Sequence, residues 1–302
     1  MTNTYGIILT IISGICAGLF GLGYKDSLKI FTSSIHFLIY YSASFLIVAL
    51  LGAFLFNELS LQYDLLIYGI PNGTFMFLAV YYYFDLIKNT QLNTSWTVIQ
   101  FNIIIPVLFS IIVFKEKLQL LTVIGFVLMV TAILCFGKGK NHGNITNNEE
   151  NKKFIDLKLF LATFFSGLTA TVPKLYNAQA SFIQPYALGA ASSATMLLII
   201  LMLFFIKPYW NRVDFQHTSH VSFKNRIRPP LTMAILQMVA MASITFALSS
   251  VQGSIAFPVK SLMALLTVYI SAFLIFKEKL NSWEIAGAVF SMIAIASITS
   301  SM

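Results

Sequence analysis

Charged residues are scarce in this sequence of 302 residues, where Asp, Glu, Lys and Arg together make up only 10%. A soluble domain typically carries about 25% charged and about 45–50% apolar residues. Here hydrophobic residues make up 58% of the chain, and the mean hydropathy is +0.81. These proportions exclude a soluble enzyme and a soluble nucleic-acid-binding protein, and they predict an integral membrane protein.

The motifs of several catalytic classes are also missing. The sequence has no P-loop, HExxH, GxSxG or GxGxxG motif, so we do not expect the chain to hydrolyse ATP itself. Its two cysteines, Cys16 and Cys135, lie in apolar runs and form no CxxC pair. His217 and His220 are interpreted as part of a solvated loop. We therefore expect no enzymatic activity, no metal and no cofactor.

Long apolar runs are abundant. A helix needs about 20 apolar residues to cross a bilayer, and the runs do not alternate as the strands of a membrane barrel do. We therefore predict an all-α membrane protein whose ten transmembrane helices cover residues 5–23, 34–56, 63–87, 92–114, 119–136, 156–177, 184–206, 230–249, 254–276 and 281–300. Two polar stretches interrupt this pattern, a linker at 137–155 and a basic loop at 207–228.

An internal repeat divides the chain. The string FKEKL at 114–118 recurs at 276–280, an offset of 162 residues. At this offset, 9 of the 23 positions from 114 to 136 are identical. In both copies the string links the fourth and fifth spans of its half. A fainter match pairs Ser13-Gly14 in the first span with Ser166-Gly167 in the sixth.

The repeat predicts two five-helix halves, residues 1–145 and 146–302, with the linker at their junction. Because five is odd, the second half must enter the membrane from the opposite side. The halves are then inverted repeats, related by a pseudo-twofold axis in the membrane plane. Transporters use this design to hold a substrate near the midplane, where the halves meet. We expect a central cavity there.

These features resemble the EamA branch of the drug/metabolite transporter superfamily. The resemblance covers nearly the whole chain and is best at 103–133 and 261–298. Pro106 lies where the family often has a proline before the hairpin glutamate, whereas Val268 takes this place in the second half. The resemblance implies a basket of ten helices around a central cavity. It also implies transport of amino acids or other small metabolites, or exchange of phosphorylated sugars or nucleotide sugars as in plastid and Golgi relatives.

Two lysines within or near the spans are the first candidate binding residues. Lys260 lies about 9 Å into the ninth span at 1.5 Å per residue, just after Pro258. It either lines the cavity or reaches back to the interface. Lys174, near the end of the sixth span, is on the same membrane side, so the two could converge on a carboxylate or phosphate, or Lys174 could be interfacial. Ser261 follows Lys260 where sugar-phosphate relatives have a second basic residue, which weakens the phosphate hypothesis.

The acidic candidates are few. Asp85 is interpreted as an i,i+3 partner of Lys88, or alternatively as a proton- or cation-coupling carboxylate. Glu116 and Glu278, in the two FKEKL strings, are expected to cap helices and form local ion pairs, or to make gating contacts between the halves.

Uncharged polar and aromatic residues complete the candidate substrate site. Gln100 and Asn102 in the fourth span and Gln237 in the eighth either bond to another helix or line the cavity. Of the tyrosines at 81–83, at least one must face inward, because adjacent helical positions are about 100° apart. We select Tyr82 from this run and Trp96 from the fourth span.

The net charge of +8 is attributed to cytoplasmic loops rather than to nucleic-acid binding. Fifteen Lys and Arg residues lie on the side of the midpoint linker, and only Lys115 and Lys117 lie on the other, apart from Lys174 and Lys260. The positive-inside rule therefore predicts a multi-pass cell-membrane protein with both termini outside. The family resemblance implies the reverse orientation.

The favoured function is a secondary transporter that moves a small organic solute, preferably an amino acid or another carboxylate, by alternating access. Its partners are that solute and the lipid bilayer, and the chain is expected to be a monomer or a homodimer. An organic-phosphate or sugar-phosphate exchanger is one alternative, and a non-transporting receptor or assembly subunit is another. An intramembrane enzyme would need a cluster of His, Asp or Glu at mid-depth, and the spans carry essentially none.

Overall fold

The computed structural model describes residues 3–58, 62–88, 92–138, 149–180, 182–206, 222–274 and 282–300. Within these ranges all regular secondary structure is helical. The helices are α1 (Asn3–Leu28), α2 (Ser34–Leu55), α3 (Tyr63–Ile87), α4 (Leu92–Ile99), the 3₁₀ helix η1 (Gln100–Ile103), α5 (Ile104–Phe114), α6 (Leu120–Lys138), α7 (Glu149–Gln179), α8 (Pro185–Ile206), α10 (Phe223–Ala247), α11 (Gly253–Leu274) and α12 (Ser282–Thr299).

These helices correspond to the ten expected spans, with α4, η1 and α5 forming the fourth. Eight described helices are long and apolar enough to cross a membrane, and Leu120–Phe136 is a shorter apolar helix. The span expected at 92–114 is confirmed, and the 3₁₀ helix η1 lies within it between α4 and α5. Two expected polar connections are also partly helical, since α7 begins at Glu149 and α10 at Phe223. A helix can continue beyond its apolar part because its backbone hydrogen bonds are satisfied internally.

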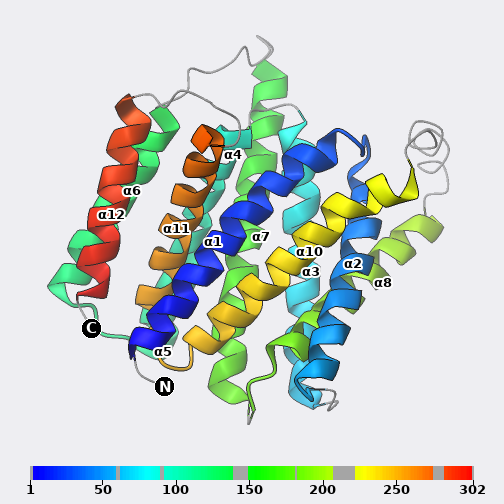
Figure 1. Cartoon of the computed structure of the whole chain (residues 1–302), viewed down its shortest axis with the longest axis horizontal. Coiled ribbons are helices and arrows are strands. Elements are labelled where there is room, and N and C mark those ends of the chain that lie inside the picture. Colours follow the sequence, from blue (N-terminus) through cyan, green and yellow to red (C-terminus); the bar gives the residue numbers. More distant parts are fainter. Residues whose placement is uncertain are drawn as a thin grey trace.

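Helices at equivalent positions in the two halves make equivalent contacts with the opposite half. Helix α1 packs against α10 and α11 of the second half, and its counterpart α7 packs against α3 and the α4–η1–α5 span of the first. Helix α2 packs against its own counterpart α8, and α6 against its counterpart α12. Figure 1 shows the α6–α12 pair at one side of the molecule and α2 with α8 at the other. The core is therefore built mainly between the halves, as an inverted repeat requires.

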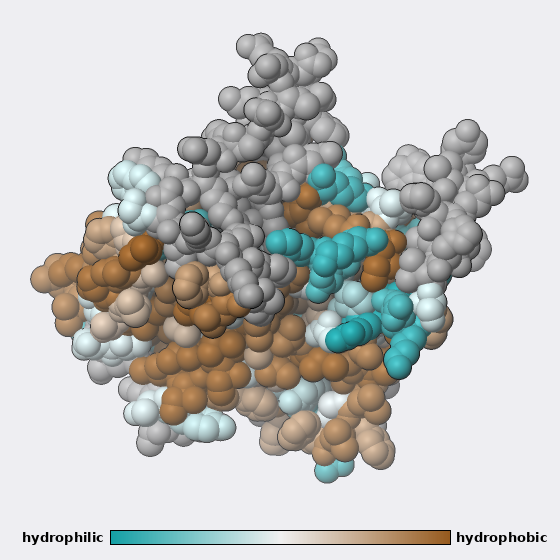
Figure 2. All heavy atoms as spheres, turned by 45° about the horizontal axis from the view of Figure 1, so that its top comes forward, coloured by the Kyte–Doolittle hydropathy of each residue, from teal (hydrophilic) through white to brown (hydrophobic). Residues whose placement is uncertain are grey.

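The outer surface is apolar. Large side chains such as Phe54, Ile112, Leu134 and Met292 are exposed, and Figure 2 shows a broad apolar band across the described part of one face. An exposed apolar surface of this extent is unfavourable in water and favourable against lipid. Both termini lie at the same end of the molecule in Figure 1, which is the result expected for an even number of spans.

Candidate functional site

A cavity of about 170 Å³ lies between the two halves. Its walls come from α1, α3, the α4–η1–α5 span, α7, α10 and α11, so both halves contribute. This volume is below the roughly 300–1,000 Å³ of pockets that hold drug-sized ligands. The cavity is therefore smaller than a typical drug-binding pocket.

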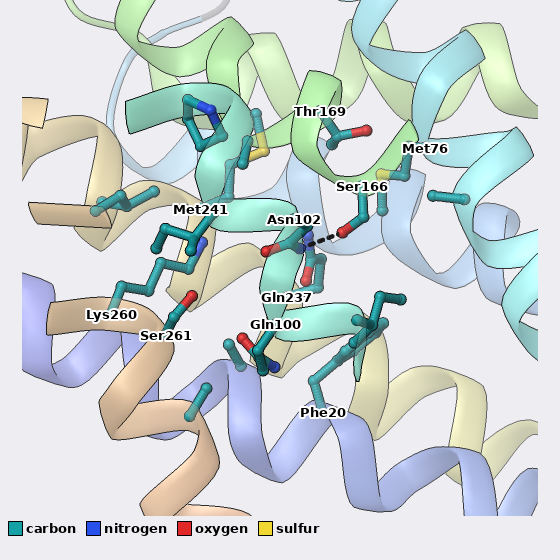
Figure 3. A pocket seen from close by; sticks show the side chains of 18 of the residues that line it. Phe20, Met76, Gln100, Asn102, Ser166, Thr169, Gln237, Met241, Lys260 and Ser261 are labelled. Carbon is teal, nitrogen blue, oxygen red and sulfur yellow. Dashed lines mark hydrogen bonds between the residues drawn. The ribbon is translucent and has the colours of Figure 1, made fainter. Parts of the chain in front are cut away.

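The break in the fourth span forms one wall of this cavity. Gln100 and Asn102 lie on η1 and line the cavity, as does Pro106 on α5. Proline has no backbone N–H, so Pro106 cannot bond the carbonyl of Asn102 four residues earlier. The Asn102 side chain donates a hydrogen bond from Nδ2 to Oγ of Ser166 on α7, at 2.7 Å (Figure 3). The break thus turns amide groups toward the cavity and ties them to the other half.

Two glycines set the position of both polar walls. A Cβ on Gly14 of α1 would lie 2.5 Å from the backbone oxygen of Lys260, and a Cβ on Gly167 of α7 would lie 2.7 Å from that of Asn102. These helices can approach so closely only because glycine has no side chain, as is common in membrane helix packing. Gly14 and Gly167 are also the glycines of the faint sequence match between the halves.

Lys260 faces the interior of the cavity. It lies seven residues after Gly253, the first residue of α11, or about 10 Å along the helix axis. Its neighbours Phe257, Val259 and Leu262 are fully buried, whereas Lys260 keeps some exposed surface and lines the cavity. Figure 3 shows its side chain reaching from α11 into the cavity. Among the described residues, no carboxylate lies within ion-pair distance of it.

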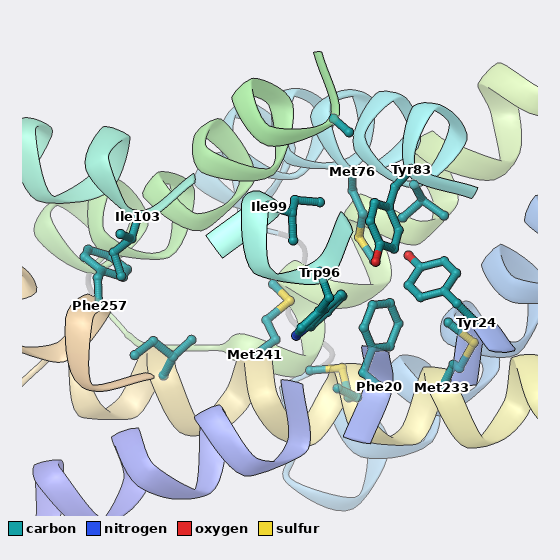
Figure 4. Packing of buried hydrophobic residues seen from close by; sticks show 14 of the residues in the cluster. Phe20, Tyr24, Met76, Tyr83, Trp96, Ile99, Ile103, Met233, Met241 and Phe257 are labelled. Carbon is teal, nitrogen blue, oxygen red and sulfur yellow. The ribbon is translucent and has the colours of Figure 1, made fainter. Parts of the chain in front are cut away.

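Aromatic rings form another part of the wall. Ring centroids are 5.3 Å apart for Phe20 and Tyr24, 4.9 Å for Tyr24 and Tyr83, and 5.8 Å for Tyr83 and Trp96 (Figure 4). The selected tyrosine, Tyr82, lies elsewhere and stacks on Phe165. Its neighbour Tyr83 lines the cavity instead, because one residue along a helix turns the side chain by about 100°.

The structure brings five of the seven expected substrate-site residues to the cavity: Lys260, Gln100, Asn102, Trp96 and Gln237. Sequence reasoning missed several others, among them Asn72, Ser166, Thr169 and Ser261. The helical spacing of Asn72, Met76 and Tyr83 was a usable signal for the α3 wall. Within the described part of the chain, His, Cys, Asp and Glu side chains form no group of three or more that could hold a metal ion.

The comparisons with known proteins agree with this architecture. The model of the EamA-like transporter family matches residues 4–137 and matches again at 153–300. The chain belongs to the EamA-like transporter family. It is therefore a multi-pass membrane transporter of the drug/metabolite transporter superfamily. No curated protein matches the sequence. A solved structure described only as "Crystal structure of protein" superposes with a TM-score of 0.71 at 10% identity, covering 97% of this chain and 96% of its own, which shows the fold alone.

In this EamA-like transporter, Lys174 lies outside the cavity and does not converge with Lys260. Its Nζ is 2.9 Å from Oε1 of Glu116 and 5.3 Å from the centre of the Phe114 ring. Glu116 follows α5 after a left-handed turn at Lys115. The sixth span, which is the first of the second half, is thus joined to the hairpin that follows the fourth span in the first half.

Glu116 also caps the first turn of α11. Its carboxylate accepts hydrogen bonds from the backbone N–H groups of Gly253 at 3.0 Å and Ser254 at 2.8 Å. Burial would raise the pKa of Glu116, but these two bonds and the ammonium of Lys174 outweigh it and hold the pKa below its usual value. Glu116 therefore caps a helix of the second half and forms its ion pair with Lys174 across the halves, whereas a local ion pair with a flanking lysine was expected. Glu278, its counterpart, lies outside the described residues.

A second carboxylate makes an equivalent contact at the same end of the molecule, and the sequence reasoning missed it. Glu58, just after α2, accepts hydrogen bonds from the backbone N–H groups of Tyr186 at 2.8 Å and Ala187 at 3.0 Å, in the first turn of α8. Burial raises the pKa of Glu58, and the two hydrogen bonds offset part of this rise. Each carboxylate belongs to the first half and caps a helix of the second, where the helix dipole favours negative charge.

Asp85 is part of an ion cluster at the opposite end. Its Oδ1 is 3.6 Å from Nζ of Lys88, as the i,i+3 spacing predicts, and its Oδ2 pairs with Lys158 at the beginning of the sixth span. Among the described residues, an ion pair toward each end of α7 therefore joins this helix to the first half. Lys158 and Lys174 are 16 residues apart, or about 24 Å along the helix.

Proposed function

We propose that this EamA-like transporter is a secondary carrier for a small organic anion, with an amino acid or another carboxylate-bearing solute as the favoured cargo. The supporting observation is the ammonium of Lys260, which faces a cavity between two inverted halves without a carboxylate partner among the described residues. A charge held inside a membrane protein is costly unless it is paired. A carboxylate on the cargo supplies the missing pair.

The rest of the lining favours one negative charge on the cargo. Lys260 is the only charged residue among the described side chains that line the cavity. The nearby groups are amides and hydroxyls, including Gln237 and Ser261 (Figure 3). A phosphate ester carries up to two negative charges, and its recognition commonly uses several cationic or amide donors. A carboxylate therefore fits this lining better than an organic phosphate.

The aromatic part of the wall suggests where an apolar portion of the cargo lies. Phe20, Tyr24, Tyr83 and Trp96 present ring surface to the cavity (Figure 4). Rings of this kind bury apolar groups efficiently. The proposed binding mode places the carboxylate at Lys260 and the apolar portion against these rings.

Alternating access requires contacts that close each side in turn. At the end of the molecule where both termini lie, we assign closure to two contacts. One joins Glu116 to Lys174 and α11, and the other joins Glu58 to α8. Closure at the other end is assigned to Asp85 with Lys158. All of these contacts join the first half to the second, so rocking of one half against the other would break one set while the other holds. With the positive-inside rule, the end of the termini is proposed to be external in the cell membrane.

Counterflow in proteoliposomes tests the proposed function. The purified transporter is reconstituted with one unlabelled metabolite inside, and uptake of the same labelled metabolite is measured. Acceleration by small carboxylates but not by cations supports the proposal. Exchange restricted to cations would overturn the assignment of an anionic cargo, and exchange restricted to organic phosphates would establish the alternative exchanger. Failure of every solute across a broad panel, in protein that keeps its fold, would favour a receptor or assembly subunit.

Cysteine accessibility tests the proposed closure. Ala170 lines the cavity from α7, and Ala170→Cys in a chain without Cys16 and Cys135 reports entry of a thiol reagent. Glu116→Gln is expected to speed labelling of the introduced cysteine by reagent that enters from the end of the molecule where the termini lie, because the ion pair to Lys174 is lost. Asp26→Asn is a matched control, since it removes an exposed ion pair with Lys29. Equal labelling rates in both variants would contradict the gating role of Glu116.

A further inference from the structure

Asn72 belongs to the cavity wall formed by α3. The lining residues of this helix are Asn72, Met76, Ala79, Val80 and Tyr83, whose spacing places them on one helical face. Figure 3 shows Met76, one turn beyond Asn72, pointing toward the cavity. The Asn72 side chain is only 2% exposed. It is therefore a buried polar group on the face that the cavity uses.

The hydrogen bonds of Ser192 fix the orientation of the Asn72 amide. The Ser192 hydroxyl donates its hydrogen to the backbone oxygen of Leu188 at 2.7 Å. A serine hydroxyl has only one hydrogen, so its oxygen must accept when it meets Asn72. Asn72 Nδ2 is the donor, at 2.9 Å from Ser192 Oγ. The amide nitrogen is thus turned toward α8, which does not line the cavity, and Oδ1 is turned away from α8.

Oδ1 of Asn72 is buried and has no hydrogen-bond partner. The surrounding packing prevents an easy adjustment: a Cβ on Gly73 would lie 2.2 Å from the backbone oxygen of Ser192, and one on Gly69 would lie 2.5 Å from Cβ of Ala191. Helices α3 and α8 are therefore in close contact on both sides of Asn72. A buried acceptor without a partner is unfavourable and calls for an explanation, one being a role in binding.

Lys260 lies at a similar depth on a different wall. Asn72 is nine residues after the start of α3 and Lys260 is seven after the start of α11, or about 14 and 10 Å along their helices. Both helices begin at the end of the molecule where the termini lie. In Figure 3, Lys260 and Met76 approach the cavity from opposite sides. Lys260 thus lies on one wall of the cavity, and Asn72, whose Oδ1 is buried and has no partner, lies on another.

We propose that Asn72 is a specificity-determining residue, whose Oδ1 accepts a hydrogen bond from a donor group on the transported carboxylate. The inference rests on the proposed function, in which Lys260 binds the carboxylate. The cargo class is then a small carboxylate that also carries an ammonium or a hydroxyl group. A carboxylate without such a donor leaves Oδ1 unpaired and binds more weakly, because sites built to bond a polar group discriminate against analogues that lack it.

Competition in the counterflow assay tests this inference with two series of carboxylates. Alanine, lactate and propanoate share one skeleton, and phenylalanine, 3-phenyllactate and 3-phenylpropanoate share another. Within each series only the ammonium, hydroxyl or hydrogen on the α-carbon differs. We expect donor-bearing members of the better-bound series to compete more strongly than the unsubstituted acid, by on the order of 10- to 100-fold. The comparison between ammonium and hydroxyl identifies the donor.

Three variants attribute the preference to Asn72. Asn72→Leu removes the acceptor and is expected to abolish the preference, so that donor-bearing acids compete no more strongly than the unsubstituted acid. Asn72→Asp keeps an acceptor and is expected to favour ammonium over hydroxyl; it also tests the inference if the leucine variant does not fold. Asn177→Leu is the matched control, because this asparagine also has an unpartnered Oδ1 and donates to the Thr245 oxygen, but does not line the cavity.

The outcomes separate this inference from the proposed function. Equal competition by all members of a series, or an unchanged preference in Asn72→Leu, would overturn the role of Asn72 while carboxylate transport stands. Loss of preference in Asn177→Leu as well would show that the effect is structural and would also overturn it. Absence of competition by every carboxylate would overturn the proposed function, and this inference with it.

Discussion

Replacing Lys260 with Met is the sharpest perturbation of the proposed site. Methionine is unbranched like lysine and fills a similar space, but it carries no charge. Lys260 is expected to pair with the cargo carboxylate inside the cavity, and at about 4 Å two unit charges attract by about 4 kcal/mol at an effective dielectric constant of 20. Desolvation of both groups reduces the net gain. We therefore expect Lys260→Met to cost about 2–4 kcal/mol of cargo binding.

This loss corresponds to a decrease of about 30- to 700-fold in kcat/KM for carboxylate counterflow, at 1.4 kcal/mol per tenfold. Stability should change in the opposite direction. Without cargo, Lys260 has no carboxylate partner among the described residues, and replacing an unpaired buried charge with an apolar group is stabilising. The thermal unfolding midpoint of Lys260→Met is therefore expected to rise. A variant damaged in folding would lose both activity and stability, so the two measurements distinguish the causes.

Lys29→Met is the control, because Lys29 is exposed and pairs with Asp26 at the end of α1. It should leave transport and the unfolding midpoint nearly unchanged, since exposed ion pairs contribute little. Lys260→Arg keeps the charge and should retain part of the activity. If Lys260→Met transports every tested carboxylate with an unchanged KM, Lys260 does not bind the cargo and the electrostatic reasoning is refuted.

Three further predictions concern the packing, the hairpin and the orientation. Gly14→Ala should lower stability by about 1–3 kcal/mol and raise the KM for carboxylates, because its Cβ would lie 2.5 Å from the Lys260 oxygen; thermal unfolding and counterflow measure both effects. Wild type should be more stable than Glu116→Gln, because the pKa of Glu116 is lowered in the folded state. This advantage should be complete above the ordinary glutamate pKa of about 4.3 and be lost as pH falls below it. Unfolding midpoints of both proteins, measured as a function of pH, test this. Ser300→Cys, exposed at the end of α12, should react with an impermeant maleimide on intact cells, as termini outside require.

Each of these predictions has a clear contrary result. A Cβ on Gly287 of α12 would lie 3.0 Å from the Phe136 ring, and Gly287→Ala should leave KM unchanged. An equal change in KM in Gly287→Ala and Gly14→Ala would show that the effect of Gly14→Ala does not act through Lys260. A stability advantage that disappears already near pH 6 would contradict a lowered pKa for Glu116. Protection of Ser300→Cys until the cells are permeabilised would establish the orientation that the family resemblance implies.

Much of the architecture could be predicted because it depends on local composition. Bilayer thickness sets the length of a span, so apolar runs located the helices, and the FKEKL repeat at an odd number of spans implied inversion. The ends of the helices were less predictable, since α7 and α10 continue into polar sequence. The 3₁₀ break at η1 was also missed, although Pro106 was noticed as a family feature.

The candidate site was predictable in part. Lys260, Gln100, Asn102 and Gln237 stood out because polar groups are rare in spans, and all four line the cavity. Tyr82 does not line the cavity. The sequence could not show which of the three adjacent tyrosines does, because this depends on how α3 is rotated relative to its neighbours. Lys174 also lies elsewhere, since its partner Glu116 is 58 residues away in the sequence. Glu58 gave no signal at all, because it bonds backbone N–H groups of a helix in the other half.

The sequence by itself determined that this protein crosses the membrane as helices in two inverted halves, because the bilayer constrains every span through local hydrophobicity and length. Only the tertiary structure decided which polar groups meet. It joined Lys174 to Glu116 and left Lys260 facing the cavity, and it turned the Asn72 amide so that Oδ1 has no partner. Such pairings depend on how helices from different halves rotate and approach each other, and glycines such as Gly14 and Gly167 set that approach through contacts distant in the sequence.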